Sequence, residues 1–135
     1  MTATTAFGDW NTPQPFALPE LGPGVEGPLR KQIERVLRQI AADPKVRAVV
    51  IFGSRAQGRA GPQSDLDLLV VERTPHLEPQ MKLDSWWRHM RLLEALPLSV
   101  DLVVAGSHDA AHLAGSRWHV ISEAARHGRV VAVKP

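Results

Sequence analysis

The chain has 135 residues, of which 44% are hydrophobic, and a formal net charge of +2. This length suits a single domain with a packed core and leaves no room for two ordinary domains. The absence of cysteine excludes a disulfide framework, a thiolate zinc site and a cysteine nucleophile.

No basic segment followed by a long apolar run opens the sequence, and no apolar stretch approaches the roughly 20 residues that span a bilayer. We therefore expect a cytoplasmic protein with no membrane partner. Lys and Arg form no dense block, and this pattern argues against nucleic acid as the acceptor of any reaction.

The first 28 residues are rich in residues that break helices and strands. They include five prolines and four glycines, so we expect no regular element there. We interpret residues 1–28 as an N-terminal tail and residues 29–135 as the folded domain. The tail is either a flexible leader that is partly held against the domain or an arm that wraps a partner subunit.

From Pro28 onward, helical and strand-like patterns alternate. Pro28 suits the first turn of a helix, and Asp43-Pro44 ends it because a residue before proline avoids the α region. The run 46–52 is apolar and rich in β-branched residues, which predicts a buried first strand.

The later elements follow in the same way. We expect a short helix at residues 54–59, strands at 65–71 and 98–104, and a long helix at 80–96 between them. The helical sequence after Ser107 is split near Gly115, and a short edge strand at 129–133 follows Gly128. The pattern predicts an α/β fold: a small mixed sheet with helices packed mainly on one face.

Three carboxylates lie in the strand-like runs. Asp65 and Asp67 are two positions apart, so in a strand they share a face at roughly 6.5 Å. Two adjacent carboxylates repel each other, and a divalent cation with a preference for hard oxygen ligands, Mg²⁺ or Mn²⁺, removes the conflict. Asp101 joins the cluster if its strand lies next to theirs. Three carboxylates can hold two ions about 3.5–4 Å apart.

A Gly53-Ser54 turn follows the first strand. A tight turn at this point exposes backbone N–H groups, which favours an anion such as a phosphate. The Ser54 hydroxyl is a further donor, and Arg55 or Arg59 can add positive charge. A phosphate site beside a metal site is what a nucleoside triphosphate requires.

The run G-S-R-A-Q-G followed by S-D-L-D-L-L-V, with Gly53 and Asp65 twelve positions apart, resembles the nucleotidyltransferase signature of the DNA polymerase beta superfamily. The short length and the D-L-V-V run at Asp101 make the chain most similar to minimal nucleotidyltransferase (MNT) domains, over about residues 30–133. The resemblance implies the polymerase beta palm-like fold.

The resemblance also implies roles for individual residues. Gly53, Ser54 and Arg55 would contact the triphosphate. Asp65 and Asp67 would bind both metal ions, with Asp101 as the third carboxylate and a candidate to take the acceptor's proton. Gln57 departs from the family pattern, because a second basic residue is frequent at this position.

Many MNT proteins are antitoxins of HEPN/MNT toxin–antitoxin modules. This similarity implies Mg²⁺-dependent transfer of AMP from ATP to a tyrosine hydroxyl of an all-helical HEPN toxin. Two alternatives stay open. The chain could act on a small molecule, as aminoglycoside nucleotidyltransferases do, or it could be a non-catalytic module that neutralises its partner by occlusion.

Two further motifs have simpler interpretations. His108 and His112 are four apart and could face together as zinc ligands, but we favour a surface helix on which Asp109 points elsewhere. A helix cannot easily bury both indoles of Trp86-Trp87 against one core. We expect one tryptophan in the core and the other exposed as an anchor for a partner.

Overall fold

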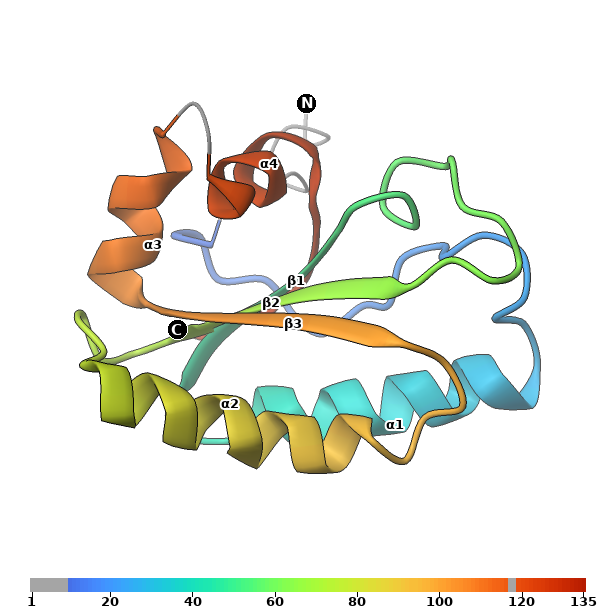
Figure 1. Cartoon of the computed structure of the whole chain (residues 1–135), viewed down its shortest axis with the longest axis horizontal. Coiled ribbons are helices and arrows are strands. Elements are labelled where there is room, and N and C mark those ends of the chain that lie inside the picture. The colour runs from blue at the N-terminus through green and yellow to red at the C-terminus, as the bar shows by residue number, and fades with distance from the viewer. Residues whose placement is uncertain (1–9, 117–118) are drawn as a thin grey trace.

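The computed structural model describes residues 10–116 and 119–135. Among these residues, a four-stranded mixed sheet in the order β3-β2-β1-β4 has helices on both faces (Figure 1). The elements in chain order are α1 (Pro28–Ala42), β1 (Val46–Phe52), β2 (Leu66–Glu72), α2 (Pro79–Leu93), β3 (Val100–Gly106), α3 (Ser107–Ala114), α4 (Val120–His127) and β4 (Arg129–Val133).

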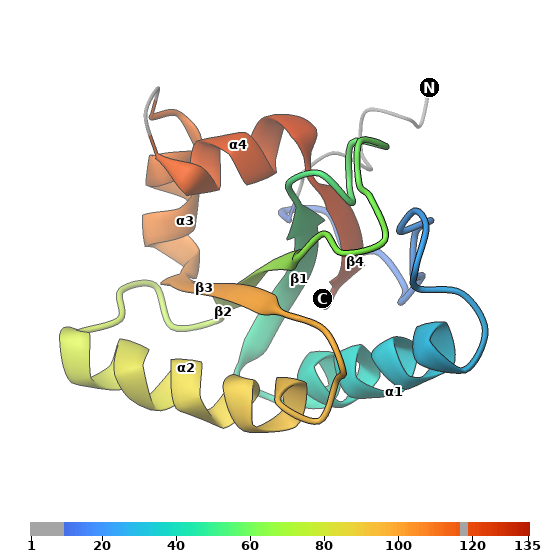
Figure 2. The same cartoon turned by 45° about the vertical axis from the view of Figure 1, so that its right-hand side comes forward.

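The sheet combines both kinds of strand pairing. β1 is antiparallel to β2 and to β4, whereas β2 is parallel to β3. A parallel pair needs a crossover connection, and α2 supplies it (Figure 2). The two long helices α1 and α2 lie together below the sheet in Figure 1, and the short helices α3 and α4 lie above it. The α/β fold with a mixed sheet is confirmed, and the second face is covered as well.

The core is divided by the sheet into two layers. Ile33, Leu37 and Ile40, which form an apolar stripe on one side of α1, are fully buried against one face of the sheet. Alternate residues of β1 and β2 point into the two layers, for example Val49 into the first and Val50 into the second. Both strands are therefore buried on both sides, and the prediction of a buried first strand at 46–52 is confirmed.

The short helix predicted at residues 54–59 is wrong. This segment forms hydrogen-bonded turns, in which Gln57 N–H and Arg59 N–H both donate to the Ser54 carbonyl. Gly58 has a φ of 73°, which takes the chain out of the helical conformation before a second turn can form. The result is a compact loop between β1 and β2.

The described part of the N-terminal tail, residues 10–27, packs on the domain. Trp10, Leu21 and Val25 are buried in the core layers. Gln14 pairs with Val133, so the tail covers the outer edge of β4. Regular structure begins at Pro28, and the described part of the tail is held against the domain. A partner-wrapping role for residues 1–9 lies outside the described residues.

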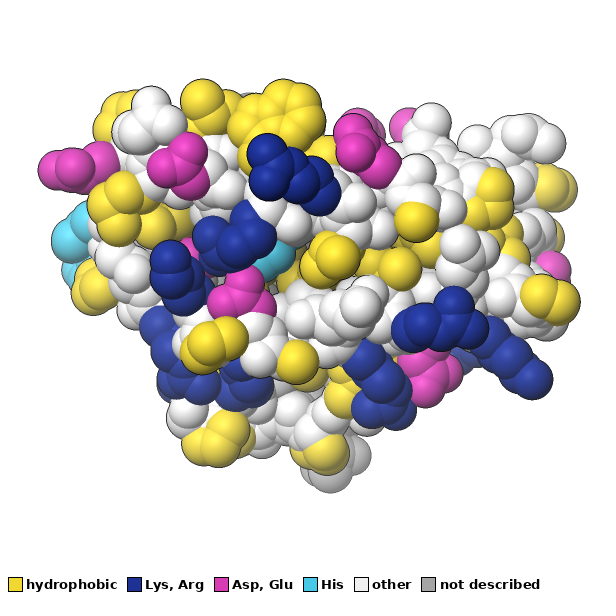
Figure 3. All heavy atoms as spheres, turned by 90° about the horizontal axis from the view of Figure 1, so that it is seen from below, with side chains coloured by type: hydrophobic (Ala, Val, Ile, Leu, Met, Phe, Trp, Pro, Cys, Tyr) yellow, Lys and Arg dark blue, Asp and Glu magenta, His cyan; other side chains and the backbone are white. Residues whose placement is uncertain are grey.

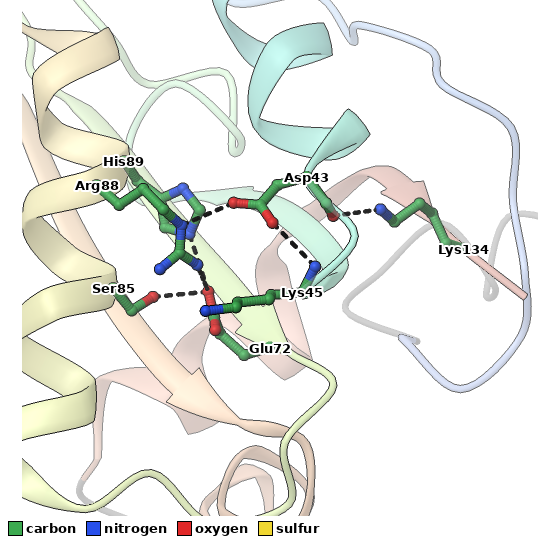
Figure 4. Close-up of polar contacts among 7 residues, drawn as sticks. All are labelled: Asp43, Lys45, Glu72, Ser85, Arg88, His89 and Lys134. Carbon is green, nitrogen blue, oxygen red and sulfur yellow. Dashed lines mark hydrogen bonds and ion pairs between the residues drawn. The ribbon is translucent and has the colours of Figure 1, made fainter.

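A buried polar network lies at the carboxyl end of β2 (Figure 4). Glu72 is 3% exposed, and its Oε2 accepts hydrogen bonds from Ser85 Oγ at 2.6 Å, Arg88 Nη2 at 2.7 Å and His89 Nε2 at 3.0 Å. Arg88 Nε also donates to Asp43 Oδ2 at 2.7 Å, which ties α2 to the end of α1. Burial alone would raise the pKa of Glu72, but these hydrogen bonds and charges hold that pKa below its ordinary value.

This network also decides which face of α2 is buried. Ser85, His89 and Leu93 point inward, whereas Leu83 and Trp87 are exposed at 50% and 45%. The helix is rotated so that polar side chains reach Glu72. Trp86 packs beside the core and donates from Nε1 to the Leu102 carbonyl, so one tryptophan is inside and the other outside, as predicted.

Figure 3 shows the outer surface of α1 and α2, where apolar and basic side chains are mixed. Among the described residues, no helix has the length and hydropathy to cross a membrane.

Replacing Glu72 tests the importance of the network. We expect Glu72→Ala to lower the free energy of unfolding by about 2–4 kcal/mol, because it leaves Arg88 and His89 without their shared acceptor. Urea denaturation followed by circular dichroism measures this change. Glu34→Ala removes an exposed ion pair with Arg38 and serves as the control, with an expected loss below about 0.5 kcal/mol. Equal losses of unfolding free energy in the two variants would contradict the conclusion that the Glu72 network stabilises the fold.

Candidate active site

Two of the predicted carboxylates face each other across neighbouring strands. Asp67 on β2 is in register with Asp101 on β3, and their side chains are within hydrogen-bond distance. Asp65 lies one residue before β2 and is close enough to act electrostatically on Asp67. The parallel pairing of β2 and β3 thus brings together three carboxylates that are 36 positions apart at the extremes, from Asp65 to Asp101.

The cluster concentrates negative charge around Asp67. The pKa of Asp67 is raised to about 6, first by burial, then by the hydrogen bond with Asp101 and by the charges of Asp101, Asp65 and Glu123. Asp65 and Asp101 are exposed, whereas Asp67 is partly buried. The arrangement is a set of hard oxygen ligands that an external cation would relieve.

The Gly53 turn lies directly against this cluster. Gly53 has a φ of 73°, and a Cβ atom at this position would lie 2.0 Å from Asp67 Oδ2. Only glycine allows the turn and the carboxylate to approach so closely. Ser54 follows as the next residue of the turn, and its carbonyl accepts hydrogen bonds from the N–H groups of Gln57 and Arg59. The Gly53 turn and the carboxylates therefore meet at one place.

Arg55 has a different position from the one expected for a triphosphate ligand. Its side chain is only 2% exposed, and its guanidinium donates to the carbonyls of Leu21, Pro23, Gly61, Pro62 and Ser64. All of its donor nitrogens are engaged, so we correct its role. Arg55 fixes the loop between β1 and β2 to the N-terminal segment and has no donor left for a phosphate.

Two charged residues near the site were missed in the sequence. Glu123, in the first turn of α4, acts on Asp67 as a further negative charge. Arg129, at the start of β4, donates from Nε to the Ala56 carbonyl at 3.3 Å and so brings a cation beside the turn. Its partner in the sheet is Ile51, near the end of β1. Neither residue belongs to a local motif, and only the antiparallel order of β1 and β4 and the packing of α4 bring them here.

A family model described as "Nucleotidyltransferase domain" matches residues 30–131. The chain belongs to the nucleotidyltransferase domain family. The match includes the Gly53 turn and the strands that carry Asp67 and Asp101, and the protein is a nucleotidyltransferase. No curated protein matches the sequence significantly.

One solved structure supports the fold, and two others show a weaker similarity. A candidate nucleotidyltransferase from Sulfolobus solfataricus is 20% identical, with 74% of this chain and 76% of that chain covered and a TM-score of 0.51. A toxin–antitoxin structure with AMP-PNP is 22% identical, with 77% and 73% covered and a TM-score of 0.45. A mutant MntA-HpeT toxin–antitoxin is 20% identical, with 77% and 73% covered and a TM-score of 0.44.

The raised pKa of Asp67 predicts how stability depends on pH. The unfolded carboxyl titrates near 3.8 and the folded one near 6, so the free energy of unfolding falls as pH rises between these values and stays lower above 6. At pH 7.5 in EDTA we therefore expect Asp67→Asn to be more stable than the wild-type nucleotidyltransferase by about 1 kcal/mol, after allowance for solvent screening. Thermal unfolding at pH 4 and pH 7.5 measures the difference.

Near pH 4 the two proteins should differ little, because both then carry an uncharged side chain at position 67. Mg²⁺ should raise the melting temperature of the wild type more than that of Asp67→Asn. If Asp67→Asn were less stable than the wild type at pH 7.5 in EDTA, the result would contradict the conclusion that the charged form of Asp67 destabilises the folded protein.

Gly53 and Gly58 form a matched pair for testing the turn. Both have a φ of 73°, so alanine at either position costs about 1–2 kcal/mol in backbone strain. A Cβ at Gly58 meets nothing within 4 Å, whereas one at Gly53 displaces the Asp67 carboxylate. We expect Gly53→Ala to lose at least tenfold in Mg²⁺ affinity, measured by calorimetry, and Gly58→Ala to keep wild-type affinity. Equal affinities would contradict the close approach as a functional constraint.

Proposed function

We propose that this nucleotidyltransferase transfers the AMP group of ATP to a hydroxyl group of a partner protein and releases pyrophosphate, with Mg²⁺ as cofactor. One observation carries the proposal: Asp67 and Asp101 are in register on parallel strands, with Asp65 beside them and the Gly53 turn in van der Waals reach of Asp67. This combination offers a place for hard cations next to a place for a polyphosphate, which together match a nucleoside triphosphate.

The carboxylates fit divalent ions. Their oxygens are the ligands that Mg²⁺ prefers, with Mn²⁺ as an alternative. The pKa of Asp67 is raised first by burial and then by the neighbouring carboxylates, whose charge a cation would neutralise. We propose that Asp65, Asp67 and Asp101 hold the ions. When bound, such ions supply Lewis acidity and charge neutralisation for displacement at a phosphoryl group.

Other groups of the chain are proposed to bind the triphosphate and to accept a proton from the acceptor. The N–H groups of Gly53 and Ser54 and the Ser54 hydroxyl are proposed to bind and orient the triphosphate. Asp101 is exposed on β3, the outermost strand of the sheet, so its carboxylate is accessible to an incoming hydroxyl and can accept its proton. Donor and acceptor would then approach the carboxylates from different sides.

We propose a protein acceptor, and specifically a HEPN toxin that this antitoxin silences in the cytoplasm. The open position of Asp65 and Asp101 suits a hydroxyl carried by a large partner. Exposed Leu83 and Trp87 on α2 add apolar surface of the kind that is enriched in protein interfaces. The toxin's identity as a HEPN protein follows from the sequence resemblance to MNT antitoxins.

A labelling experiment tests the proposal. The purified protein is incubated with Mg²⁺, α-labelled ATP and proteins that co-purify with it from its own host, and label is followed on gels and in the small-molecule fraction. We expect label on a protein, with at least a hundredfold loss in Asp65→Asn/Asp67→Asn because the metal ligands are removed. Labelled GTP, CTP and UTP in parallel reactions test the preference for ATP.

Asp84→Asn is the matched control, because Asp84 is an exposed carboxylate on α2 that pairs with Gln80 away from the cluster. Label that appears in the small-molecule fraction would replace the protein acceptor by a small one. If the partner is neutralised without any label, and neutralisation survives the double substitution, the protein acts by occlusion and the catalytic proposal is wrong.

A further inference from the structure

Three potential metal ligands meet at the end of the sheet opposite to the carboxylate cluster. They are His76, in the connection after β2, and His108 and Asp109, in the first turn of α3. One ligand atom from each lies within 4.8 Å of the others. Asp67 and this group are separated by the length of β2 and β3, roughly 15–20 Å. His76, His108 and Asp109 are therefore too far away to belong to the proposed nucleotide site.

The backbone beneath this group is tightly fixed. The N–H groups of His108 and Asp109 donate to the Pro75 carbonyl at 3.0 and 3.2 Å, and Ser107 N–H donates to the Thr74 carbonyl at 3.0 Å. A Cβ at Gly106 would lie 2.5 Å from the Pro75 oxygen, so glycine is needed where β3 leads into α3. Backbone hydrogen bonds therefore hold the connection after β2 against the start of α3. The backbone positions of the three residues are fixed relative to one another.

The side chains already interact with one another. His76 Nδ1 lies 2.7 Å from Asp109 Oδ1, and the rings of His76 and His108 have centroids 4.7 Å apart at 57°. The hydrogen bond with His76 is the first cause of a lowered pKa at Asp109, with the charges of His76 and His108 acting in the same direction. Two imidazoles and a carboxylate are a ligand set typical of Zn²⁺, with a fourth position left for water.

We propose that His76, His108 and Asp109 form a binding site for a borderline divalent metal ion such as Zn²⁺, distinct from the nucleotide site. A bound ion would link the connection after β2 to the first turn of α3. His76 and His108 are exposed, so small rotations of their side chains can place the ligand atoms about 2.0–2.2 Å from a bound zinc ion, the usual metal–ligand distance. His112, which the i, i+4 spacing with His108 nominated in the sequence, is not part of the group.

Two features of the surroundings could oppose a cation. The positive end of the α3 dipole points toward the site, but its leading N–H groups are already paired with the carbonyls of Thr74 and Pro75. Arg47 and Arg73 line the cleft beside His108, and their guanidinium groups donate to backbone carbonyls. Neither feature engages the imidazole or carboxylate atoms that would bind the metal.

Zn²⁺ titration of a tag-free protein tests the proposal. The background is Asp65→Asn/Asp67→Asn, which removes two ligands of the proposed Mg²⁺ site so that zinc cannot be held there in the same way. We expect calorimetry to show saturable binding of a single Zn²⁺ per chain. His76→Ala and His108→Ala should each weaken it at least tenfold, with circular dichroism confirming that both variants are folded. Co²⁺ should give the visible absorption of a four-coordinate ion.

His127→Ala is the matched control, since His127 is exposed on α4 and outside the group. It should bind Zn²⁺ as tightly as the background protein. The proposal is overturned if the background protein binds no Zn²⁺, or if His76→Ala binds normally. Loss of binding in His112→Ala but not in His76→Ala would assign zinc to the His108–His112 pair instead and would equally overturn the proposed ligand set.

Discussion

The strands β2 and β3 run parallel, and one group of functional side chains at each end of this pair depends on that direction. A parallel pair aligns like ends, so Asp67 comes to lie beside Asp101 at the amino ends of the strands. It also requires a crossover helix, and α2 must pack back on the sheet to provide it. At the carboxyl ends, the same alignment brings the residues after β2 next to the start of α3. An antiparallel pair would have separated each of these groups.

The two acidic side chains on β2 show how neighbours decide the state of a carboxylate. Burial disfavours the charged form of both Asp67 and Glu72. Around Glu72 the protein supplies a hydroxyl, a guanidinium and an imidazole, so the net effect is a lowered pKa. Around Asp67 it supplies more carboxylates, and the pKa rises. One end of the strand is thus satisfied internally, whereas the other is stabilised best by a cation from outside, which is the electrostatic signature of a ligand site rather than of a structural ion pair.

Much of the fold could be predicted because its signals are local. The β-branched run of β1 and the stripe of α1 with Pro28 at its start each determine their element within a few residues. The Asp-x-Asp spacing likewise places two carboxylates together without knowledge of the rest. Local signals fail where a distant residue decides. Ser85 and His89 lie beside Leu93 on the inward face of α2 because Glu72 is buried on another element, and nothing in the sequence of α2 shows this.

The same distinction explains Arg55. A basic residue after a Gly-Ser turn is a natural phosphate ligand by local pattern, but the carbonyls of Leu21 and Pro23 in the N-terminal segment occupy its guanidinium. The consequence reaches the site. The loop that begins at Gly53 is held by Arg55 both at its own far end, through Ser64, and at the N-terminal segment. The conformation of the Gly53 turn therefore depends on a Pro/Gly-rich stretch whose composition shows no sign of such a role. A buried guanidinium can unite two irregular segments because it offers five donors in a rigid plane, whereas an apolar residue at the same place would leave those carbonyls unpaired.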